Sequence, residues 1–531
     1  MSWSRASSGD VMRLLTVAAL LVLSCNRDVR PEPPAGPATE ATLFFTSELE
    51  GYLGPCGCSE SMRGGIDRAA FQVAEARKSG KPVLLLDTGN ALFGTATIAP
   101  DAVLQQERKA RTLAQAMTLM GLGAKVNGPL DDARGAGFRT SLALPALPSD
   151  TMKSFELAGH QVVVISSANG DALFTLAAQA RAAKAGVIVG LFEGPVDEAL
   201  RFSQREGLEL DLLLATRGRD AISTESNRLV MTRVPVVQLQ SKGRSLLRVD
   251  LFLRRGGNVQ WLKSPSETQR EVEALGQRIE LLRAQVNDPS LGDELKALKK
   301  AKLEEVIARR EALASEQVPV PTTGSAASAR IVPLETSFEK LPAATELLKA
   351  YDRDVGEANL AWAKEHGVEC EAPEPGKPSY VGTELCRACH PAAFDAWKQT
   401  KHAKAHDALV TEGKNNHLDC VACHLTGWKE RGGVCRLDQV EGRTQVGCES
   451  CHGPGSSHLS LPMKTTIFVP KDATTCVTCH DRENSPHFDL EKYLPKLIAP
   501  GHGLPMPVVD AGVVEAPDAG AAAKPAKKPR K

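Results

Sequence analysis

Four copies of the pattern Cys-x-x-Cys-His lie in the C-terminal third of this chain of 531 residues. In this pattern the two cysteines form thioethers to a porphyrin and the following histidine binds its iron, which is the attachment chemistry of c-type haem. The alternative, structural zinc, requires no histidine directly after the second cysteine. Because the histidine recurs at one spacing, the sequence predicts four covalently attached haems, held by Cys386, Cys389, His390, Cys420, Cys423, His424, Cys448, Cys451, His452, Cys476, Cys479 and His480.

The ligand on the far side of each iron decides what that haem does. His390, His424, His452 and His480 are the proximal ligands, and a second histidine makes a haem a six-coordinate electron carrier. An open position makes it a site where a small molecule binds. Six further histidines lie near the motifs, which permits full bis-histidine ligation without requiring it: His402, His406, His417, His458, His487 and His502.

The N-terminal residues 1–25 read as a secretory signal. Arg13 precedes a short apolar run, Leu14 to Leu23, which is too short to span a bilayer. The run ends in Leu-Val-Leu-Ser-Cys, which resembles the bacterial lipoprotein box and implies a lipid on Cys25. The alternative is an ordinary signal peptide. We therefore expect a lipid-anchored, periplasm-facing protein of the cell envelope, and Asn26 after the anchor favours the outer membrane.

Composition separates the flexible ends from the folded parts. Residues 26–40 form a Pro-rich tether, and residues 504–531 are rich in Ala, Pro and Lys, so we expect that tail to be disordered. The 64 basic and 64 acidic side chains balance. This balance gives no indication of nucleic acid as a partner.

Residues 41–262 alternate short apolar runs with helical patterns such as Ala102–Met120, which predicts an α/β domain. The strand-rich end of this stretch indicates an antiparallel edge or a second sheet. The expected strands are Thr42–Thr46, Val83–Asp87, Gln161–Ser166, Val187–Leu191, Leu210–Leu214, Val230–Gln238 and Ser245–Arg254.

Residues 263–316 are highly charged, have helical spacing and break once, which predicts a helical hairpin. The hairpin serves either as a spacer or as a dimerisation arm. Residues 317–379 read as a linker with a strand and a helix, Ala343 to His366. Residues 380–503 provide too little chain per haem for an ordinary apolar core, so we expect short helices and loops around the porphyrins and no folded apo form.

The last of these segments resembles the tetrahaem cytochrome c-554 family. The resemblance is carried by Tyr380 to Cys386, Trp397 to Ala403, Gly447 to Gly455 with His458, and Ser485-Pro486 before Phe488. It implies closely packed haems that pass electrons along a chain. It also implies distal ligands at His402 and His458, with His502 as a third candidate and His406, His417 and His487 as weaker ones. One haem of the family is open on its distal side, and here that haem is the one at Cys420–His424.

The N-terminal body resembles the 5′-nucleotidase branch of the metallophosphatases. The likeness rests on Thr46 to Leu53, Gly64 to Arg68 and Leu84 to Asn90. In that branch an Asp-x-His pair, a bridging Asp and further histidines hold two metal ions that activate water. Here Glu48-Leu49-Glu50 stands at the Asp-x-His position, Asn90 stands at the bridging Asp, and His160 is the one histidine before residue 366. We therefore expect a metallophosphatase-like layered sheet without a dinuclear centre. In the alternative, Glu48, Glu50 and Asp87 hold a single hard cation.

Four cysteines remain after Cys25 and the eight haem cysteines. Cys370 and Cys435 are candidates for a disulfide in an oxidising compartment. A bridge within Cys56-Gly57-Cys58 would be strained, so these two are candidates for redox chemistry or metal binding.

The predicted function is an electron relay between periplasmic or membrane redox proteins, with the phosphatase-like domain as a docking module. One alternative is a reductase that acts on a small nitrogen or sulfur compound at an open haem. A second alternative is a redox-linked metallophosphoesterase.

Overall fold

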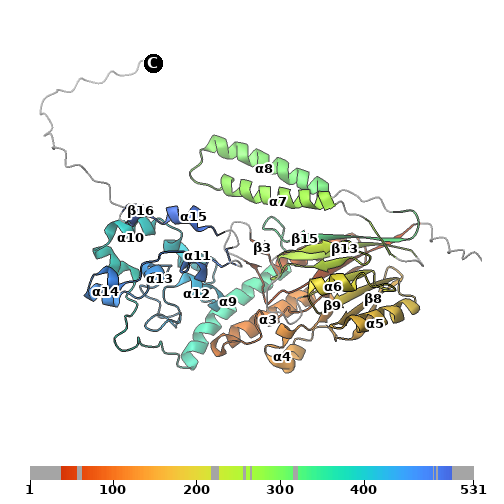
Figure 1. The fold of residues 1–531 in the computed structure, drawn as a ribbon, viewed down its shortest axis with the longest axis horizontal. Coiled ribbons are helices and arrows are strands. Elements are labelled where there is room, and N and C mark those ends of the chain that lie inside the picture. Colours follow the sequence, from red (N-terminus) through yellow and green to blue (C-terminus); the bar gives the residue numbers. More distant parts are fainter. Residues whose placement is uncertain are drawn as a thin grey trace, which may run out of the picture. The chain divides into compact units, whose positions relative to one another are not determined.

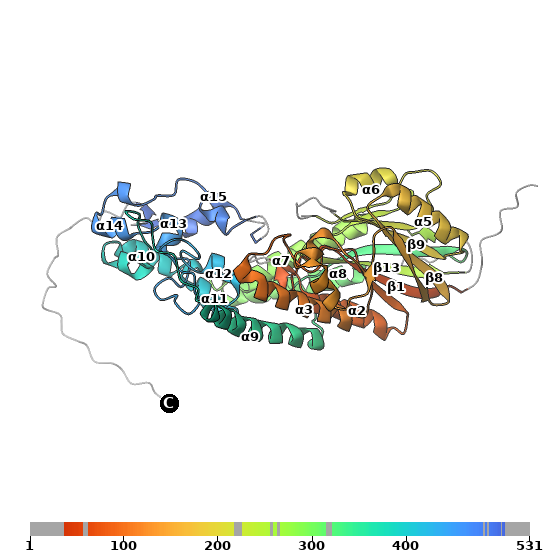
Figure 2. The same ribbon diagram turned by 90° about the horizontal axis from the view of Figure 1, so that it is seen from below.

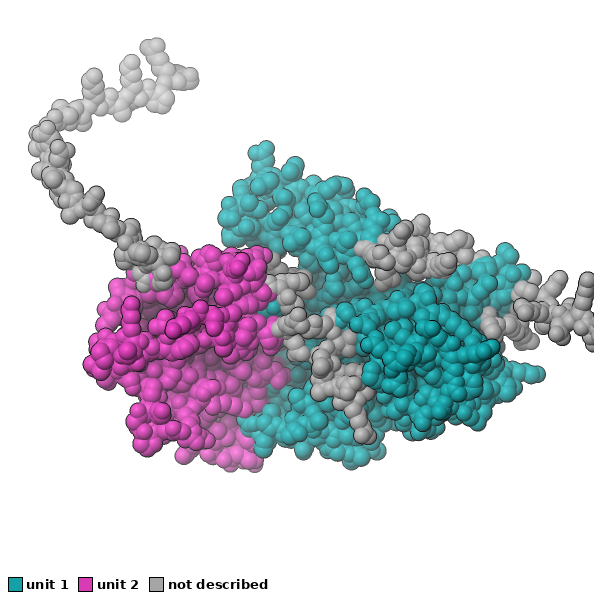
Figure 3. Space-filling view, in the orientation of Figure 1, with its two compact units in different colours: residues 1–358, 483–485 teal, residues 359–482, 486–531 magenta. Residues whose placement is uncertain are grey.

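A computed structural model describes residues 37–56, 62–216, 226–254, 259–262, 266–314, 321–481, 484–485, 488–500 and 502–504. The chain divides into two compact units, residues 1–358 with 483–485 and residues 359–482 with 486–531 (Figure 3). The division falls within helix α9 (Pro342–Glu365). Within these ranges we find no helix with the length and apolar character needed to cross a membrane.

The first unit contains a seven-stranded sheet in the order β14-β15-β13-β1-β4-β5-β6. Its strands β13 and β15 are labelled in Figure 1. Its centre is β1, which pairs in parallel with β4 and antiparallel with β13. The carboxyl ends of the parallel strands β1, β4 and β5 therefore meet at one edge. The strands are β1 (Thr39–Thr46), β4 (Val83–Asp87), β5 (Leu122–Val126), β6 (Ala146–Leu147), β13 (Ser245–Leu253), β14 (Val259–Trp261) and β15 (Ser325–Pro333).

A second sheet has six strands in the order β11-β12-β10-β9-β8-β7. Its inner strands are parallel, and β7 and β11 pair antiparallel at the two edges. The strands are β7 (Thr151–Leu157), β8 (His160–Ser167), β9 (Val187–Phe192), β10 (Leu212–Ala215), β11 (Arg228–Val230) and β12 (Val236–Gln238). A separate two-stranded ribbon is formed by β2 (Pro55–Cys56) and β3 (Arg63–Gly64).

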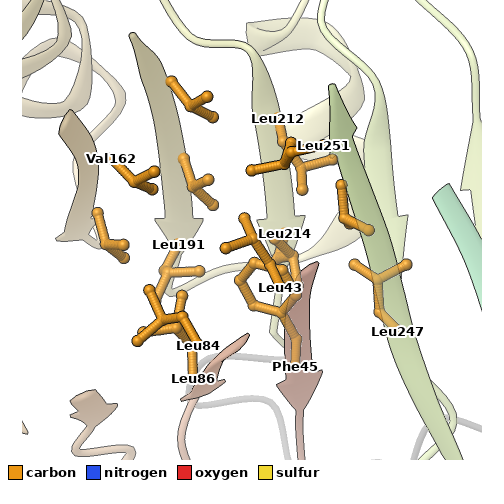
Figure 4. Close-up of a cluster of buried hydrophobic side chains, with 14 of the residues drawn as sticks. Leu43, Phe45, Leu84, Leu86, Val162, Leu191, Leu212, Leu214, Leu247 and Leu251 are labelled. Carbon is orange, nitrogen blue, oxygen red and sulfur yellow. The ribbon is translucent and has the colours of Figure 1, made fainter. Parts of the chain in front are cut away.

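The two sheets pack face to face through one apolar core (Figure 4). Side chains of a strand alternate between its faces, so Leu43 and Phe45 of β1 enter this core beside Leu214 of the second sheet. Phe44 and Leu85 point to the opposite face and pack under helices. Both faces of the central strands are therefore buried, which explains their nearly continuous apolar sequences.

Helices cover the outer face of each sheet (Figure 2). Helix α3 (Val103–Leu119) buries Leu113 and Met117, which lie one turn apart on one face, against the seven-stranded sheet next to α2 (Ile66–Lys78). Helices α5 (Gly170–Ala182) and α6 (Val196–Phe202) cover the other sheet. The Asn169 side chain caps α5 by accepting the N–H groups of Asp171 and Ala172. The expected layered α/β fold is confirmed.

The expected helical hairpin is present as α7 (Ser266–Val286) and α8 (Asp293–Ala314). Ile279 and Leu282 of α7 pack against Val306 of α8. The strand expected in the following linker is β15, and it lies inside the seven-stranded sheet beside β13. The hairpin is thus an insertion between two strands of one sheet, and the sheet extends past residue 262.

Two features of the sheets differ from expectation. The single strand expected at Val230–Gln238 is wrong, because the chain turns between β11 and β12, and these two pair antiparallel. Pro235 has no N–H to donate, and the Thr232 hydroxyl hydrogen-bonds to the Val234 carbonyl at 2.5 Å, so both favour a turn here. Strands β5, β6, β7 and β14 were not recognised in the sequence.

Short helices and loops make up the second unit, as expected. The helices are α10 (Pro391–Lys398), α11 (Ala405–Thr411), α12 (Leu418–His424), α13 (Cys448–His452), α14 (Ser456–Ser460) and α15 (Leu490–Tyr493), with 3-10 turns at Thr383–Ala388, His402–Lys404 and Cys476–Thr478. A disulfide joins Cys370 to Cys435 and closes a loop with a sequence separation of 65, which confirms this expected pair.

Removal of this disulfide should destabilise the second unit. A cross-link over a loop of this length restricts the unfolded chain enough to contribute up to about 4 kcal/mol. We therefore expect the Cys370→Ser/Cys435→Ser variant of the holoprotein to unfold at lower denaturant concentration. Treatment of the wild type with a reductant should give the same shift, and coincident unfolding curves for the oxidised, reduced and variant proteins would contradict this role.

Candidate haem-binding site

Each Cys-x-x-Cys-His segment forms about one helical turn. The N–H of His390 donates to the carbonyl of Cys386 at 2.9 Å, and the N–H of His480 donates to that of Cys476 at 2.8 Å. The other two motifs end α12 and make up α13. Residues three apart on a helical turn share a face, so the two cysteines of each motif point the same way and the histidine stands next to them.

Three of the four proximal histidines face a second histidine ring at nearly the same separation. The pairs are His390 with His458 at 6.1 Å, His480 with His402 at 6.0 Å, and His452 with His502 at 6.4 Å between ring centres. Imidazole nitrogens bound on opposite sides of one metal lie about 4 Å apart, which puts their ring centres about 6 Å apart, because each metal–nitrogen bond is about 2 Å. The three pairs therefore fit one iron between each two rings.

Hydrogen bonds fix the tautomer of several of these rings. Nδ1 of His452 lies 3.0 Å from the Phe468 carbonyl, and Nδ1 of His502 lies 2.9 Å from the Leu497 carbonyl. A carbonyl only accepts, so Nδ1 carries the proton and Nε2 keeps the lone pair that binds a metal. The same arrangement holds for His424 with the Ala405 carbonyl at 2.6 Å and for His458 with the Met463 carbonyl at 3.1 Å.

Burial favours the neutral, ligating form of these histidines. It lowers the pKa of His402, and the nearby His480 lowers it further. Burial is also the main cause that lowers the pKa of His452 and of His480. Iron binds neutral imidazole, so this environment matches the ligand role.

The fourth proximal histidine, His424, differs from the other three. In the ranges that the structure describes, no second ring lies at the iron-spanning distance from it. His406 is a neighbour, because its pKa is lowered first by burial and also by the charge of His424. His417 is buried at the start of α12, where its carbonyl accepts the N–H of Cys420. His487, a further candidate, lies outside the described residues.

The cysteines show which attachment points are neighbours. The side chains of Cys386 and Cys448 are close enough to hydrogen-bond as thiols, and so are those of Cys423 and Cys479. Cys451 lies near enough to Cys476 and Cys479 for their charges to act on it. The motifs therefore neighbour one another in the order first, third, fourth, second, which differs from their order in the sequence.

The apolar side chains of this unit also fit large apolar groups. The buried ones are Phe394, Leu409, Val421, Leu425 and Val434, which is a small core for a unit of this length. Ten of the sixteen exposed large apolar side chains of the described residues lie in this unit, where porphyrins attached to the motifs would cover them: Leu385, Val410, Leu459, Leu461, Met463, Phe468, Val469, Val477, Tyr493 and Leu494. Donor set, spacing and apolar surface thus all fit haem.

Comparison with known proteins leads to the same family. Residues 385–453 match the family model described as cytochrome c554 and c-prime. Cytochrome c-554 of Nitrosomonas europaea is 36% identical over an alignment of 91 residues, and the match covers 14% of this chain and 39% of that protein. The chain therefore spans well under half of the length of this relative. The match implies covalently bound c-type haem in this part of the chain.

Solved structures similar to this chain come from another class. They include the NAD nucleotidase of Haemophilus influenzae (13% identity, TM-score 0.34, 53% of this chain and 62% of that one). They also include the sulfate thiohydrolase SoxB of Thermus thermophilus (13% identity, TM-score 0.39, 66% of this chain and 64% of that one). A 5′-nucleotidase precursor of the same species is similar too (13% identity, TM-score 0.38, 69% of this chain and 68% of that one).

In the first unit, the acidic residues singled out from the sequence gather at the edge where β1 and β4 end. Glu48, Glu50, Asp87 and Asn90 are all buried, and the Asn90 amide donates to both carboxylate oxygens of Glu48 at 3.2 Å. Glu48, Glu50 and Asn90 have positive φ values of 51°, 51° and 53°. Such backbone conformations are uncommon outside glycine and cluster where a fold holds polar groups in fixed positions.

A buried lysine completes this edge and was not among the residues predicted from the sequence. Lys125 at the end of β5 is 1% exposed, and its ammonium lies 2.6 Å from Oδ2 of Asp131, which is fully buried. Asp131 also accepts the backbone N–H groups of Asn90, Leu92 and Gly128. The charge of Asp131 is therefore neutralised from within the chain. A lysine in a short apolar run was the available signal, but that run was not read as a strand.

These residues do not fit a dinuclear metal centre. The edge carries no histidine, and Glu48 and Asp131 already have partners from the chain. Among the described residues no group of three or more His, Cys, Asp or Glu side chains is arranged to hold a metal ion. Cys58 lies outside the described residues. The absence of hydrolytic metals stays a prediction, which the occupied carboxylates support.

Burial raises the pKa of Asp87 to about 7, against the opposing effects of the Lys125 ammonium and the Thr46 hydroxyl. An unfolded aspartate titrates near pH 4, so Asp87 stabilises the fold fully below about pH 4 and loses this contribution as the pH rises to 7. We expect the stability of the wild type relative to Asp87→Asn to fall by up to about 4 kcal/mol over this range, as measured by denaturant unfolding of the first unit in the holoprotein. Asp197→Asn, at a side chain that is 74% exposed, is the control. Parallel profiles of wild type and Asp87→Asn would contradict this assignment.

Proposed function

We propose that this protein is a lipid-anchored, periplasm-facing tetrahaem cytochrome that relays electrons between redox partner proteins. The observation that carries the proposal is the set of three histidine pairs at 6.0–6.4 Å, each joining a Cys-x-x-Cys-His histidine to a distant one. These pairs support His458, His502 and His402 as distal ligands of the first, third and fourth haem. A bound haem supplies one-electron redox chemistry, and the histidines hold its iron low-spin in both oxidation states.

The neighbouring cysteines support a continuous relay. Haems attached at adjacent motifs are held close together, so an electron would pass from the first through the third and fourth to the second. The disulfide supports an oxidising compartment, in agreement with the leader and lipid site expected at Cys25. The first unit would serve as a docking module for a periplasmic or membrane redox protein.

A second candidate function is a reductase at the second haem. It is favoured by His424, which has no facing ring within the described residues, so a small nitrogen or sulfur compound could bind iron there. The two candidates differ in spin state. A relay with four six-coordinate haems is low-spin throughout, whereas a reductase has one high-spin haem that binds external ligands.

Loss of one distal histidine should change a single haem. We expect His458→Ala to convert one haem of the holoprotein from low-spin to high-spin, because His390 then remains as its single axial ligand. Absorption and electron paramagnetic resonance spectra measure this change. His366→Ala is the matched control, since His366 is exposed and stacks on Trp362 at 4.3 Å. Unchanged spectra in His458→Ala would contradict the assignment of His458 as the distal ligand of the first haem.

Loss of the second motif tests both the haem number and the open position. The Cys420→Ser/Cys423→Ser variant should carry three covalent haems per chain where the wild type carries four, as counted by mass and haem absorption. If the second haem is the open one, its high-spin signal and its binding of carbon monoxide disappear together in this variant. A colourless wild type, expressed with a cytochrome-maturation system, would refute the proposed function.

A further inference from the structure

Glu449, between the two cysteines of the third motif, has no role in the functions described above. Its side chain is 3% exposed. One carboxylate oxygen accepts the N–H of Gly382 at 2.7 Å and the other accepts that of Gly455 at 2.8 Å, while the N–H of Val381 lies 2.9 and 3.1 Å from the two. The carboxylate thus joins the segment before the first motif to the segment after the third.

The geometry shows a group that only accepts hydrogen bonds. Both oxygens are occupied by N–H donors, and an ionised carboxylate is an acceptor-only group, whereas a protonated one also needs a partner for its O–H. These partners are backbone amides, which carry no net charge, and among the described residues no lysine or arginine forms an ion pair with Glu449. A full negative charge therefore stays buried here.

This charge lies beside the attachment points of two haems. Glu449 directly follows Cys448, whose side chain adjoins Cys386 of the first motif. The Glu449 carboxylate also accepts the N–H of Gly382, which lies four residues before Cys386. The field of the carboxylate thus reaches the attachment points of the first and the third haem. In a buried site this field is weakly screened.

We propose that Glu449 is a positioning residue that also sets the potentials of the first and third haems, lowering both. A ferric haem carries one more positive charge than a ferrous haem, so a nearby buried anion stabilises the ferric form. Each of these haems accepts one electron from a redox partner protein less readily and donates it onward more readily. This inference rests on the proposed function, because it requires haems at both motifs.

The test is a redox titration of the holoprotein carrying Glu449→Gln, which removes the charge and keeps the size of the side chain. We expect the reduction equilibrium of two of the four haems to shift at least tenfold towards the ferrous form, or about 59 mV for a one-electron couple. Haem content and low-spin signals should not change. Glu384→Gln is the matched control. Glu384 is exposed and lies two residues before Cys386, so water screens its charge. The haem potentials of this variant should match those of the wild type.

The outcomes separate this inference from the proposed function. If Glu449→Gln keeps four haems with unchanged potentials, the role of Glu449 is overturned and the cytochrome remains. If the wild type carries no haem, the proposed function itself fails. Should Glu449→Gln lose haem, Val381→Lys keeps the carboxylate and adds a cation beside it. We then expect the reduction equilibria of the same two haems to shift at least threefold towards the ferrous form. Unchanged potentials in this variant would overturn the inference.

Discussion

The gap of 6.0–6.4 Å between facing histidine rings is the constraint on which the second unit depends. Each pair joins segments far apart in the sequence, so ligation of an iron fixes the path of the chain between them. Its short helices bury few apolar side chains and cannot hold these segments together on their own. If these pairs hold iron as proposed, metal ligation and folding would be one process, in which the ligands acquire their geometry as the chain closes around the porphyrins.

The first unit is stabilised by different means. Two sheets and their covering helices bury three extensive apolar clusters, which need no cofactor. The acidic edge of the central sheet would be costly to bury if its charges were free. Its charge is reduced by the Lys125 ammonium, which pairs with Asp131, and by burial, which raises the pKa of Asp87. The Glu48 carboxylate is held by the Asn90 amide.

Residue types predicted the chemistry of the second unit, but not its arrangement. The pattern from Cys386 to His390 and its three repeats can be recognised without knowing how the chain folds. The resemblance to the cytochrome c-554 family also predicts His458 as a distal ligand. Which ring faces which depends on how loops cross in space, and the neighbour order of the motifs likewise appears only in the structure. In the first unit β5 was missed because Leu-Gly-Ala-Lys-Val is short and lacks alternation, and Lys125 was missed with it.

A buried carboxylate of the first unit and one of the second unit differ in whether their charge is balanced. Asp131 accepts three backbone N–H groups and also a buried ammonium, so its charge is cancelled at short range. Glu449 accepts backbone N–H groups alone, which orient and stabilise the carboxylate without removing its net charge. Its field is therefore left to act on its surroundings, and the attachment points of two haems lie within them. A neutral amide would offer only one acceptor oxygen to these N–H groups, so the contacts that join the two segments require the carboxylate and bring its charge with them.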